Sequence, residues 1–582
     1  MRYSTLFAVG AICSASNALT ISPYVKRTVF ESLADEQQLN DTTYHFAQIE
    51  SAEIFPMPKC KEITLEEATI DQLQDYMSSG KISSVDLVQC YLARYFQVND
   101  FVNGILQLNP DMFAIASRLD DERKKGVIRG PLHGIPFIVK DNYATKDKMQ
   151  TSCGSNALLG SVVPRDAHVV SKLREAGAVL FGHATLSEWA DMRSNSYSEG
   201  YSAVGGQARC PYNLTLNGGG SSTGSAGSVA ANLIMFALGT ETDGSIISPA
   251  GNNAVVGFKP TVGLTSRAGV IPESEHQDTT GPLARTVRDA VYVLQNMYGV
   301  DERDNYTLAQ VGNVPEDGNY VKFLGDRSSL KGAKFGLPWA KLWSTADEEQ
   351  VEGLLETIKL IESAGATVIN NTDFGNLDVI SDDGWNWDFG PVNESEYTVV
   401  KVDFYNNIAS YLSELENTDI RSLQDIVDYN FNNDGTEGGT PGVHPAFKSG
   451  QDGLLASLAW GGVKNETYYQ AVEFVRRTSR DEGIDYALNY TDTSTGENYQ
   501  LDGLLVPSGN SITYQQAAKA GYPMITIPVS ETSIGLPYGL GIMQTQWGEP
   551  KLIKYGSAIE DLIKGRTTPK FSDYLSKNIP VV

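Results

Sequence analysis

Short, strongly apolar runs recur along this chain, next to segments with helical periodicity. The run Ile135–Val139 is followed by a helical pattern over Val169–Glu175 and by a second run, Ala178–Phe181. Three more runs lie near the C-terminus, at Leu504–Val506, Ile525–Ile527 and Leu540–Ile542. Strands that are apolar on both sides need helices on both faces of their sheet. We therefore expect a single large α/β domain with a central mixed β-sheet covered by helices on both faces.

Two short helices are expected before this pattern begins. Thr69 and Gln72 have the spacing of a capping box, which predicts a helix that ends at Gly80. Ser83 is expected to begin the second helix. Its apolar face would carry Val85, Val88, Leu92 and Tyr95.

The size and charge of the chain restrict what it can bind. Its 582 residues are 41% hydrophobic and 20% charged, which is enough for a large core. The 45 basic and 71 acidic residues give a formal net charge of −26. Such a charge repels phosphate backbones and anionic membrane surfaces. We therefore expect a small-molecule or peptide substrate and no nucleic-acid partner.

The N-terminus has the pattern of an export signal. Arg2 precedes the apolar stretch Leu6–Ile12, and small residues, Ser16 and Ala18, stand before the expected cut. The stretch is too short to span a bilayer and no longer apolar run follows, so no transmembrane segment is expected. The predicted organisation is a signal peptide over 1–18, a polar leader over 19–60 and one domain over 61–575. Within that domain, residues 300–500 are predicted to be a variable region that shapes the substrate pocket.

Glycosylation sequons and cysteines agree with secretion. There are seven sequons, at Asn40, Asn213, Asn305, Asn370, Asn393, Asn465 and Asn489. Removal of the signal peptide would leave four cysteines, Cys60, Cys90, Cys153 and Cys210. They allow two disulfides in three pairings, and free buried thiols are an equally good interpretation.

The Gly/Ser-rich stretch over residues 218–227 is the most unusual in the chain. It is followed at once by Val229–Leu238, an apolar segment with helical character, so a tight functional turn is favoured over a flexible linker. A phosphate-binding loop fits poorly because no Gly-Lys-Ser/Thr follows.

The same stretch contains a G-x-S-x-G pattern centred on Ser222, as in the nucleophile elbow of α/β-hydrolases. That elbow needs a preceding apolar strand, and residues 212–217 do not form one. It also needs a histidine later in the chain, and only His276 and His444 are available. A Ser–His–Asp triad is therefore disfavoured.

A second candidate nucleophile, Ser245, follows the apolar segment Ile234–Leu238 in the sequence Gly239-Thr240-Glu241-Thr242-Asp243-Gly244-Ser245. A glycine beside a serine after a core strand can expose a hydroxyl and several backbone N–H groups together. The alternative is a solvated turn.

Several long motifs occur in one order along the chain. They are Gly134–Asn142, Gly219–Ser222, Gly244-Ser245 continuing to Gly257–Thr261, Gln277–Thr279 with Gly281-Pro282 and Ala284–Thr286, and Ala520–Pro523. On these motifs the chain resembles the amidase signature family from about Ile63 to Asp573. That family includes fatty acid amide hydrolase, bacterial peptide amidases and the glutaminase subunit of tRNA-dependent amidotransferases.

The resemblance implies a role for each matching residue. Ser245 would be the nucleophile, Lys140 the base, and Ser221 the bridging serine, held by a cis peptide bond to Ser222. The backbone N–H groups implied for the oxyanion hole are those of Thr242, Asp243, Gly244 and Ser245. A serine hydroxyl needs a base to take its proton, and lysine is a base only when its pKa falls well below about 10.4. Desolvation at the end of strand 135–139 would lower that pKa.

Three positions depart from the family pattern. Asp243 stands where many members have glycine, and Glu241 where many have aspartate, but the hole needs only their backbone. Ile247 stands where several relatives have arginine, which weakens the analogy with glutamine-specific members.

These features predict a secreted amidohydrolase that cleaves a linear carboxamide to a carboxylic acid and ammonia or an amine. No metal or cofactor is implied, because the six histidines show no ligand spacing. Two alternatives remain at this stage: a glutaminase subunit of an amidotransferase, and a catalytically silent binding protein on the same scaffold.

Overall fold

The computed structural model describes residues 56–492 and 494–570. The predicted signal peptide, leader residues 19–55, the sequon at Asn40 and the last residues of the predicted domain lie outside these ranges. In the part of the chain that is described, no helix is both long and apolar enough to cross a membrane.

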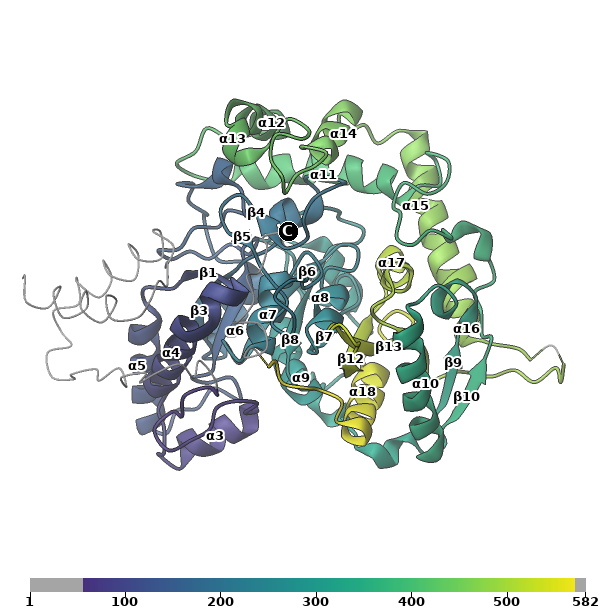
Figure 1. Ribbon diagram of the computed structural model, residues 1–582, viewed down its shortest axis with the longest axis horizontal. Coiled ribbons are helices and arrows are strands. Elements are labelled where there is room, and N and C mark those ends of the chain that lie inside the picture. Colours follow the sequence, from purple (N-terminus) through teal and green to yellow (C-terminus); the bar gives the residue numbers. More distant parts are fainter. Residues whose placement is uncertain (1–55, 493, 571–582) are drawn as a thin grey trace, which may run out of the picture.

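An eleven-stranded mixed sheet forms the centre of the molecule (Figure 1). Its order is β1-β3-β2-β6-β8-β7-β12-β13-β11-β9-β10. The pairs β3–β2, β2–β6, β11–β9 and β9–β10 are parallel, and the other pairs are antiparallel. The strands are β1 (Ile105–Leu108), β2 (Pro136–Lys140), β3 (Val179–Ala184), β6 (Phe236–Glu241), β7 (Val256–Lys259), β8 (Thr279–Ala284), β9 (Lys334–Leu337), β10 (Thr367–Asn370), β11 (Gly503–Pro507), β12 (Met524–Glu531) and β13 (Pro537–Met543).

The predicted fold class is confirmed. All five apolar runs singled out in the sequence are strands of this sheet, and β2, β3, β11 and β13 are buried along their whole length. Helices α7 (Thr223–Ala230) and α8 (Ile247–Asn252) pack against its strands, as do α9 (Val287–Met297) and α18 (Glu549–Ile563). The strands are apolar on both sides because helices exclude water from them.

The two predicted N-terminal helices are α3 (Ile70–Ser78) and α4 (Ser84–Val102). In α3, the Thr69 backbone N–H donates to the Gln72 side chain at 3.0 Å, and the Gln72 N–H donates to the Thr69 hydroxyl at 3.3 Å. Ser83 caps α4 in the same reciprocal way. The predicted capping box is therefore confirmed.

The remaining helices are shown in Figure 1. They are α5 (Met112–Lys124), α6 (His168–Glu175), α10 (Glu348–Ser363), α11 (Glu396–Ser413), α12 (Leu423–Asn432), α13 (Asp434–Glu437), α14 (Asp452–Trp460), α15 (Glu466–Ser479), α16 (Asp485–Leu488) and α17 (Ser511–Ala520). Helices α11, α12, α14 and α15 contact one another and form a group at one side of the molecule.

The helical prediction over 229–238 is wrong for most of that segment. Helix α7 ends at Ala230, and Phe236 begins β6, which pairs with β2 and β8. A run that is apolar at every position carries no periodicity, so it does not distinguish a buried helix from a buried strand. Contacts with distant strands decide the outcome.

The Gly/Ser-rich stretch is a turn followed by a helix, not a turn throughout. Thr223–Ala230 forms α7, and its small residues allow the helix to lie against neighbouring backbone. A Cβ atom at Gly224 would come within 2.4 Å of the Thr185 carbonyl oxygen and 2.5 Å of the Gly104 carbonyl oxygen. Glycine is therefore required at 224 by close packing.

Residues 300–500 are more than a surface insertion. They contain α10–α16, but they also supply β9 and β10, which extend one edge of the central sheet. Four sequon asparagines in this region, Asn305, Asn370, Asn465 and Asn489, have exposed side chains. The segment therefore combines a structural edge of the sheet with an exposed outer layer.

The sequence left open whether the cysteines form disulfides or stay free, and the structure contains both states. Cys60 and Cys90 form a disulfide, whereas Cys153 and Cys210 are buried free thiols. The disulfide joins the segment before α3 to the middle of α4.

Reduction of this disulfide should destabilise the protein. Opening a loop of 30 residues is expected to cost about 2–4 kcal/mol, because the unfolded chain gains freedom. Thermal unfolding with and without reductant should show a lower midpoint in reductant, and Cys90→Ser should abolish that difference. The matched control Cys153→Ser should keep it. A midpoint insensitive to reductant in the unaltered protein would contradict the prediction.

Candidate active site

The structure brings together the three side chains expected to act as a triad. Lys140 is the last residue of β2, and Ser221 lies just before α7. Ser245 lies in the turn between β6 and α8. The Lys140 Nζ donates to the Ser221 Oγ at 2.7 Å, and the Ser221 Oγ donates to the Ser245 Oγ at 2.9 Å. These side chains therefore form one continuous hydrogen-bonded chain.

The cis peptide bond lies one position earlier than expected. It joins Gly220 to Ser221, not Ser221 to Ser222. Ser222 donates its hydroxyl to the Thr240 carbonyl oxygen at 3.2 Å, and its backbone N–H donates to the Ser245 carbonyl oxygen. Both partners of Ser222 lie on the segment that carries Ser245, so its contacts hold the two serine-bearing segments together.

The Lys140 amine is fully buried, and this burial controls its acidity. Loss of water lowers the pKa of Lys140, and the nearby acidic side chains of Glu273 and Asp191 partly oppose that effect. The amine also donates to the hydroxyl of Thr240 at 2.9 Å and to its carbonyl oxygen at 3.3 Å. These contacts orient the nitrogen toward Ser221. Burial favours the neutral form of the amine, which can accept a proton.

Sequence reasoning missed the groups that hold Lys140 in place. Asp141, the next residue, accepts a 2.7 Å hydrogen bond from the ring of His183 on β3 and backbone N–H bonds of 3.2 Å from Ser152 and Gly154. Asp141 and His183 are buried. Asp141 stood in a quoted motif, but nothing in the spacing identified its partner, since His183 lies 42 residues away.

The turn that carries Ser245 is shaped by Glu241 and Gly244. One carboxylate oxygen of Glu241 accepts the N–H groups of Ile246 and Ile247 at 2.8 and 2.9 Å. Gly244 has a φ of +86°, and a Cβ there would lie 2.3 Å from the ring of Tyr514. The residue before Ser245 must therefore be glycine on both conformational and steric grounds.

The backbone of this turn leaves donors free. Among the described residues, the N–H groups of Asp243 and Ser245 have no hydrogen-bond acceptor. The N–H of Gly244, by contrast, faces the Glu241 carboxylate and helps to stabilise its charge. Free donors beside a nucleophile can bind an oxygen on which negative charge develops.

Asp243 also has a side-chain environment that the sequence did not predict. Its carboxyl accepts a hydrogen bond from the Trp385 indole, and its other oxygen is shielded with no partner among the described residues. Burial, reinforced by nearby Glu396, raises the pKa of Asp243 well above its usual range.

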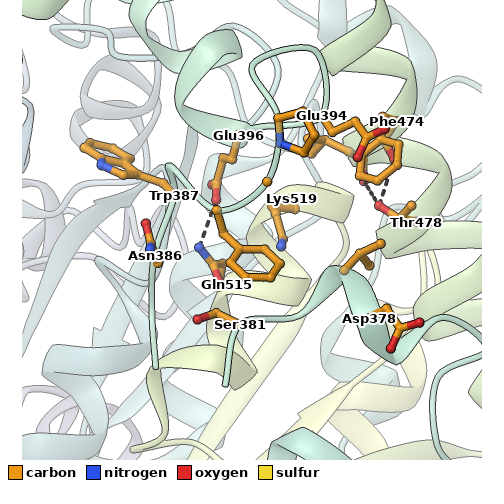
Figure 2. Close-up of a pocket in the computed structure, with 15 residues that line it drawn as sticks. Asp378, Ser381, Asn386, Trp387, Glu394, Glu396, Phe474, Thr478, Gln515 and Lys519 are labelled. Carbon is orange, nitrogen blue, oxygen red and sulfur yellow. Dashed lines mark hydrogen bonds between the residues drawn. The ribbon is translucent and has the colours of Figure 1, made fainter. Parts of the chain in front are cut away.

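Glu396 lines a cavity of about 240 Å³ (Figure 2). Glu396 begins α11 and accepts hydrogen bonds from Gln277 at 2.7 Å and Gln515 at 3.0 Å. Gln277 also donates to the Thr242 carbonyl oxygen at 3.2 Å, which connects the cavity floor to the turn of Ser245.

The two histidines available to an elbow-type triad do not contact any candidate serine. His276 contacts the Asp403 carboxylate at 2.7 Å, and His444 contacts the Tyr201 hydroxyl at 3.2 Å. Ser222 bonds to backbone, as described above. The disfavoured Ser–His–Asp interpretation is therefore not supported by the geometry.

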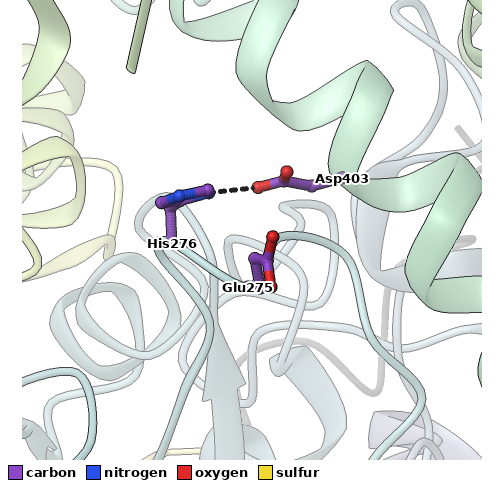
Figure 3. A group of neighbouring side chains, drawn as sticks. All are labelled: Glu275, His276 and Asp403. Atoms are coloured by element: carbon purple, nitrogen blue, oxygen red, sulfur yellow. Dashed lines mark hydrogen bonds and ion pairs between the residues drawn. The ribbon is translucent and has the colours of Figure 1, made fainter. Parts of the chain in front are cut away.

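His276 nevertheless lies close to two carboxylates, those of Glu275 and Asp403. The three side chains have the donor types of a metal site (Figure 3). The distance of Asp403 along the chain hid this group from sequence reasoning. Asp403 accepts hydrogen bonds of 2.7 Å from His276, Ser274 and Tyr468. Lys464 forms a 2.5 Å ion pair with Glu275. These protein partners explain the group as a structural network that fastens the 273–278 loop to α11 and α15.

Comparisons with known proteins agree with this geometry. Residues 86–433 match the family described as Amidase. An amidase-family protein of Schizosaccharomyces pombe is 70% identical over 582 residues, the full length of both chains. One subunit of the glutamyl-tRNA(Gln) amidotransferase of Bacillus cytotoxicus is 29% identical over 86% of this chain and 98% of its own.

Among solved structures, the native peptide amidase of Stenotrophomonas maltophilia matches with a TM-score of 0.76 and 38% identity. The match covers 87% of this chain and 99% of that enzyme. The chain therefore belongs to the amidase family and is an amide hydrolase.

Proposed function

We propose that this protein cleaves linear carboxamides through an acyl-enzyme on Ser245, with Ser221 and Lys140 as a proton relay. The observation that carries the proposal is the unbroken chain Lys140–Ser221–Ser245, with contacts of 2.7 and 2.9 Å in a buried setting. Both serine hydroxyl hydrogens can rotate, so the chain conducts a proton in either direction.

The relay accepts or returns the proton that each chemical step requires. Ser245 Oγ attacks the amide carbon while its proton moves to Ser221 and the Ser221 proton moves to neutral Lys140. The carbon–nitrogen bond then breaks, and the same relay returns a proton to the leaving nitrogen. Water next attacks the ester carbon on Ser245 and gives a proton to the relay. The bond between that carbon and Ser245 Oγ breaks, the relay returns the proton to Oγ, and the carboxylic acid is released.

The backbone of the 242–245 turn supports an oxyanion hole in this proposal. Within the expected set of Thr242, Asp243, Gly244 and Ser245, the N–H groups of Asp243 and Ser245 lack other acceptors among the described residues. They would bind the carbonyl oxygen as it gains charge. Such donors contribute about 3–4 kcal/mol each where measured in other enzymes.

The solved relative named a peptide amidase supports a peptide amide as the substrate class. The relative named for an amidotransferase supports the alternative of a glutaminase. That alternative requires glutamine to be the preferred amide, so a comparison of glutamine with N-acetyl amino-acid amides distinguishes the two. The complete triad disfavours the catalytically silent binding protein.

We further propose secretion. The N-terminal pattern supports it, as do the Cys60–Cys90 disulfide and the exposed sequon asparagines of the 300–500 region.

Replacement of the nucleophile should abolish turnover. Ser245→Ala removes the atom that forms the acyl-enzyme, so kcat should fall at least about 10³-fold, and labelling by a fluorophosphonate should be lost. Ser225→Ala is a matched control, because Ser225 is also buried but donates to the Leu238 carbonyl oxygen. It should keep labelling. A folded Ser245→Ala protein that is still labelled would refute the assignment.

The pH profile should report Lys140. Burial lowers its pKa, and only the neutral amine accepts a proton, so kcat/KM should rise as pH rises through that lowered value and stay high in the alkaline range. Lys140→Ala should be severely impaired at every pH. A profile measured with N-acetyl-alanine amide that peaks near pH 4 would instead indicate carboxylate catalysis.

Secretion predicts a processed and glycosylated protein. In a fungal expression host the mature N-terminus should lie near Leu19, and glycosidase treatment should reduce the apparent mass. N-terminal sequencing and gel mobility measure these properties. Asn465→Gln should remove one glycan if that sequon is used. An intact Met1 terminus on an unglycosylated chain would contradict secretion.

A further inference from the structure

The cavity in Figure 2 has aromatic walls and a charged floor. Trp387, Phe389 and Phe474 contribute the aromatic rings, and the ionisable side chains are Asp378, Glu394, Glu396 and Lys519. These residues come from the 378–396 segment, α15 and α17. None of them belongs to the triad, so the catalytic chemistry does not explain the cavity.

The floor of the cavity is connected to the turn that carries Ser245. A single nitrogen of Gln277 donates to the Thr242 carbonyl oxygen at 3.2 Å and to Glu396 at 2.7 Å, so those two oxygens lie within about 6 Å of each other. Helix α17 provides a second connection. Tyr514 lies against Gly244, and Gln515 and Lys519, one and five residues later on the same helix, line the cavity. The turn that carries Ser245 and the floor of the cavity are therefore connected through one side chain, Gln277.

The size of the cavity limits its occupant to one group. Sites that enclose a whole small ligand measure roughly 300–1,000 Å³, compared with about 240 Å³ here. The cavity thus suits one large side chain, and the rest of the substrate would lie outside it.

Lys519 decides which kind of side chain fits. Its ammonium points into the cavity (Figure 2), and within the described ranges it has no hydrogen bond or close ion pair. Burial lowers the pKa of Lys519, and the negative charges of Glu396 and Asp243 oppose that shift and favour the ammonium form. Glu396, by contrast, is held by the two glutamine amides. An aliphatic group would remove water from the ammonium without any compensating interaction, so its binding would be unfavourable. The face of an aromatic ring would offer a cation–π contact.

We propose that this cavity binds an aromatic side chain beside the scissile carboxamide, and that Lys519 selects aromatic over aliphatic side chains. The inference rests on the amidase function proposed above. It identifies Lys519 as a specificity residue that contacts the substrate side chain and takes no part in proton transfer.

The test compares three substrates: N-acetyl-phenylalanine amide, N-acetyl-cyclohexylalanine amide and N-acetyl-alanine amide. The first two have nearly the same shape, but only phenylalanine has a π face. In the unaltered enzyme, kcat/KM for phenylalanine should exceed that for cyclohexylalanine by roughly 3- to 30-fold. Lys519→Met should bring this ratio close to one and leave the alanine substrate within about twofold. Lys554→Met, on the exposed side of α18, is the matched control and should leave all three unchanged.

A second variant tests the cavity itself. Val475 lines it, and Val475→Phe should fill it. The expected result is a loss of at least about tenfold in kcat/KM for the phenylalanine substrate, mainly through KM, with little change for alanine. Circular dichroism would establish folding of each variant.

The outcomes separate the two proposals. If the alanine substrate is hydrolysed but the phenylalanine-to-cyclohexylalanine ratio is near one, or is unchanged in Lys519→Met, the cavity inference is wrong and the amidase function stands. If none of the three amides is hydrolysed by the folded, unaltered enzyme, the proposed function fails, and this inference fails with it.

Discussion

The site depends on the burial of one amine. A charged ammonium cut off from water is expensive, and Lys140 has no ion pair within 4 Å among the described residues; its neighbours are the hydroxyls of Ser221 and Thr240 and a backbone carbonyl. Neutral oxygen partners stabilise a charge less than a carboxylate would, so the site favours the uncharged base. The sheet makes this possible because β2, β3 and β6 exclude water around the end of β2.

Several buried contacts around the triad hold the Lys140 amine and the two serines in position. The Asp141–His183 contact secures the backbone directly after Lys140. The backbone contact between Ser222 and Ser245 ties the relay segment to the nucleophile segment. Small shifts in either would lengthen a 2.7 or 2.9 Å hydrogen bond. Positioning on this scale accounts for much of the catalytic power of an enzyme.

The sequence predicted the fold class and the capping box, because short apolar runs and caps are local signals, and the three residues that the family resemblance implied for a triad lie in one hydrogen-bonded chain. It failed where the decision was made by distant contacts. The strand beginning at Phe236 was misread because an apolar run pairs wherever tertiary structure places it. Glu396 and Lys519 were missed, since no local pattern predicts which helices meet beside a turn formed more than 100 residues earlier.

The separation along the chain of the two halves of the site also has an evolutionary consequence. The proposed triad lies between residues 140 and 245, whereas the walls of the cavity proposed to bind the substrate side chain lie between 378 and 519. A duplicated gene can therefore accumulate changes between residues 378 and 519 and acquire a different amide selectivity, while residues 140–245 stay unchanged. Recombination between paralogues near residue 300 would exchange selectivity as a block. Descendants of one ancestral hydrolase could in this way act on different amides with the same set of reacting groups.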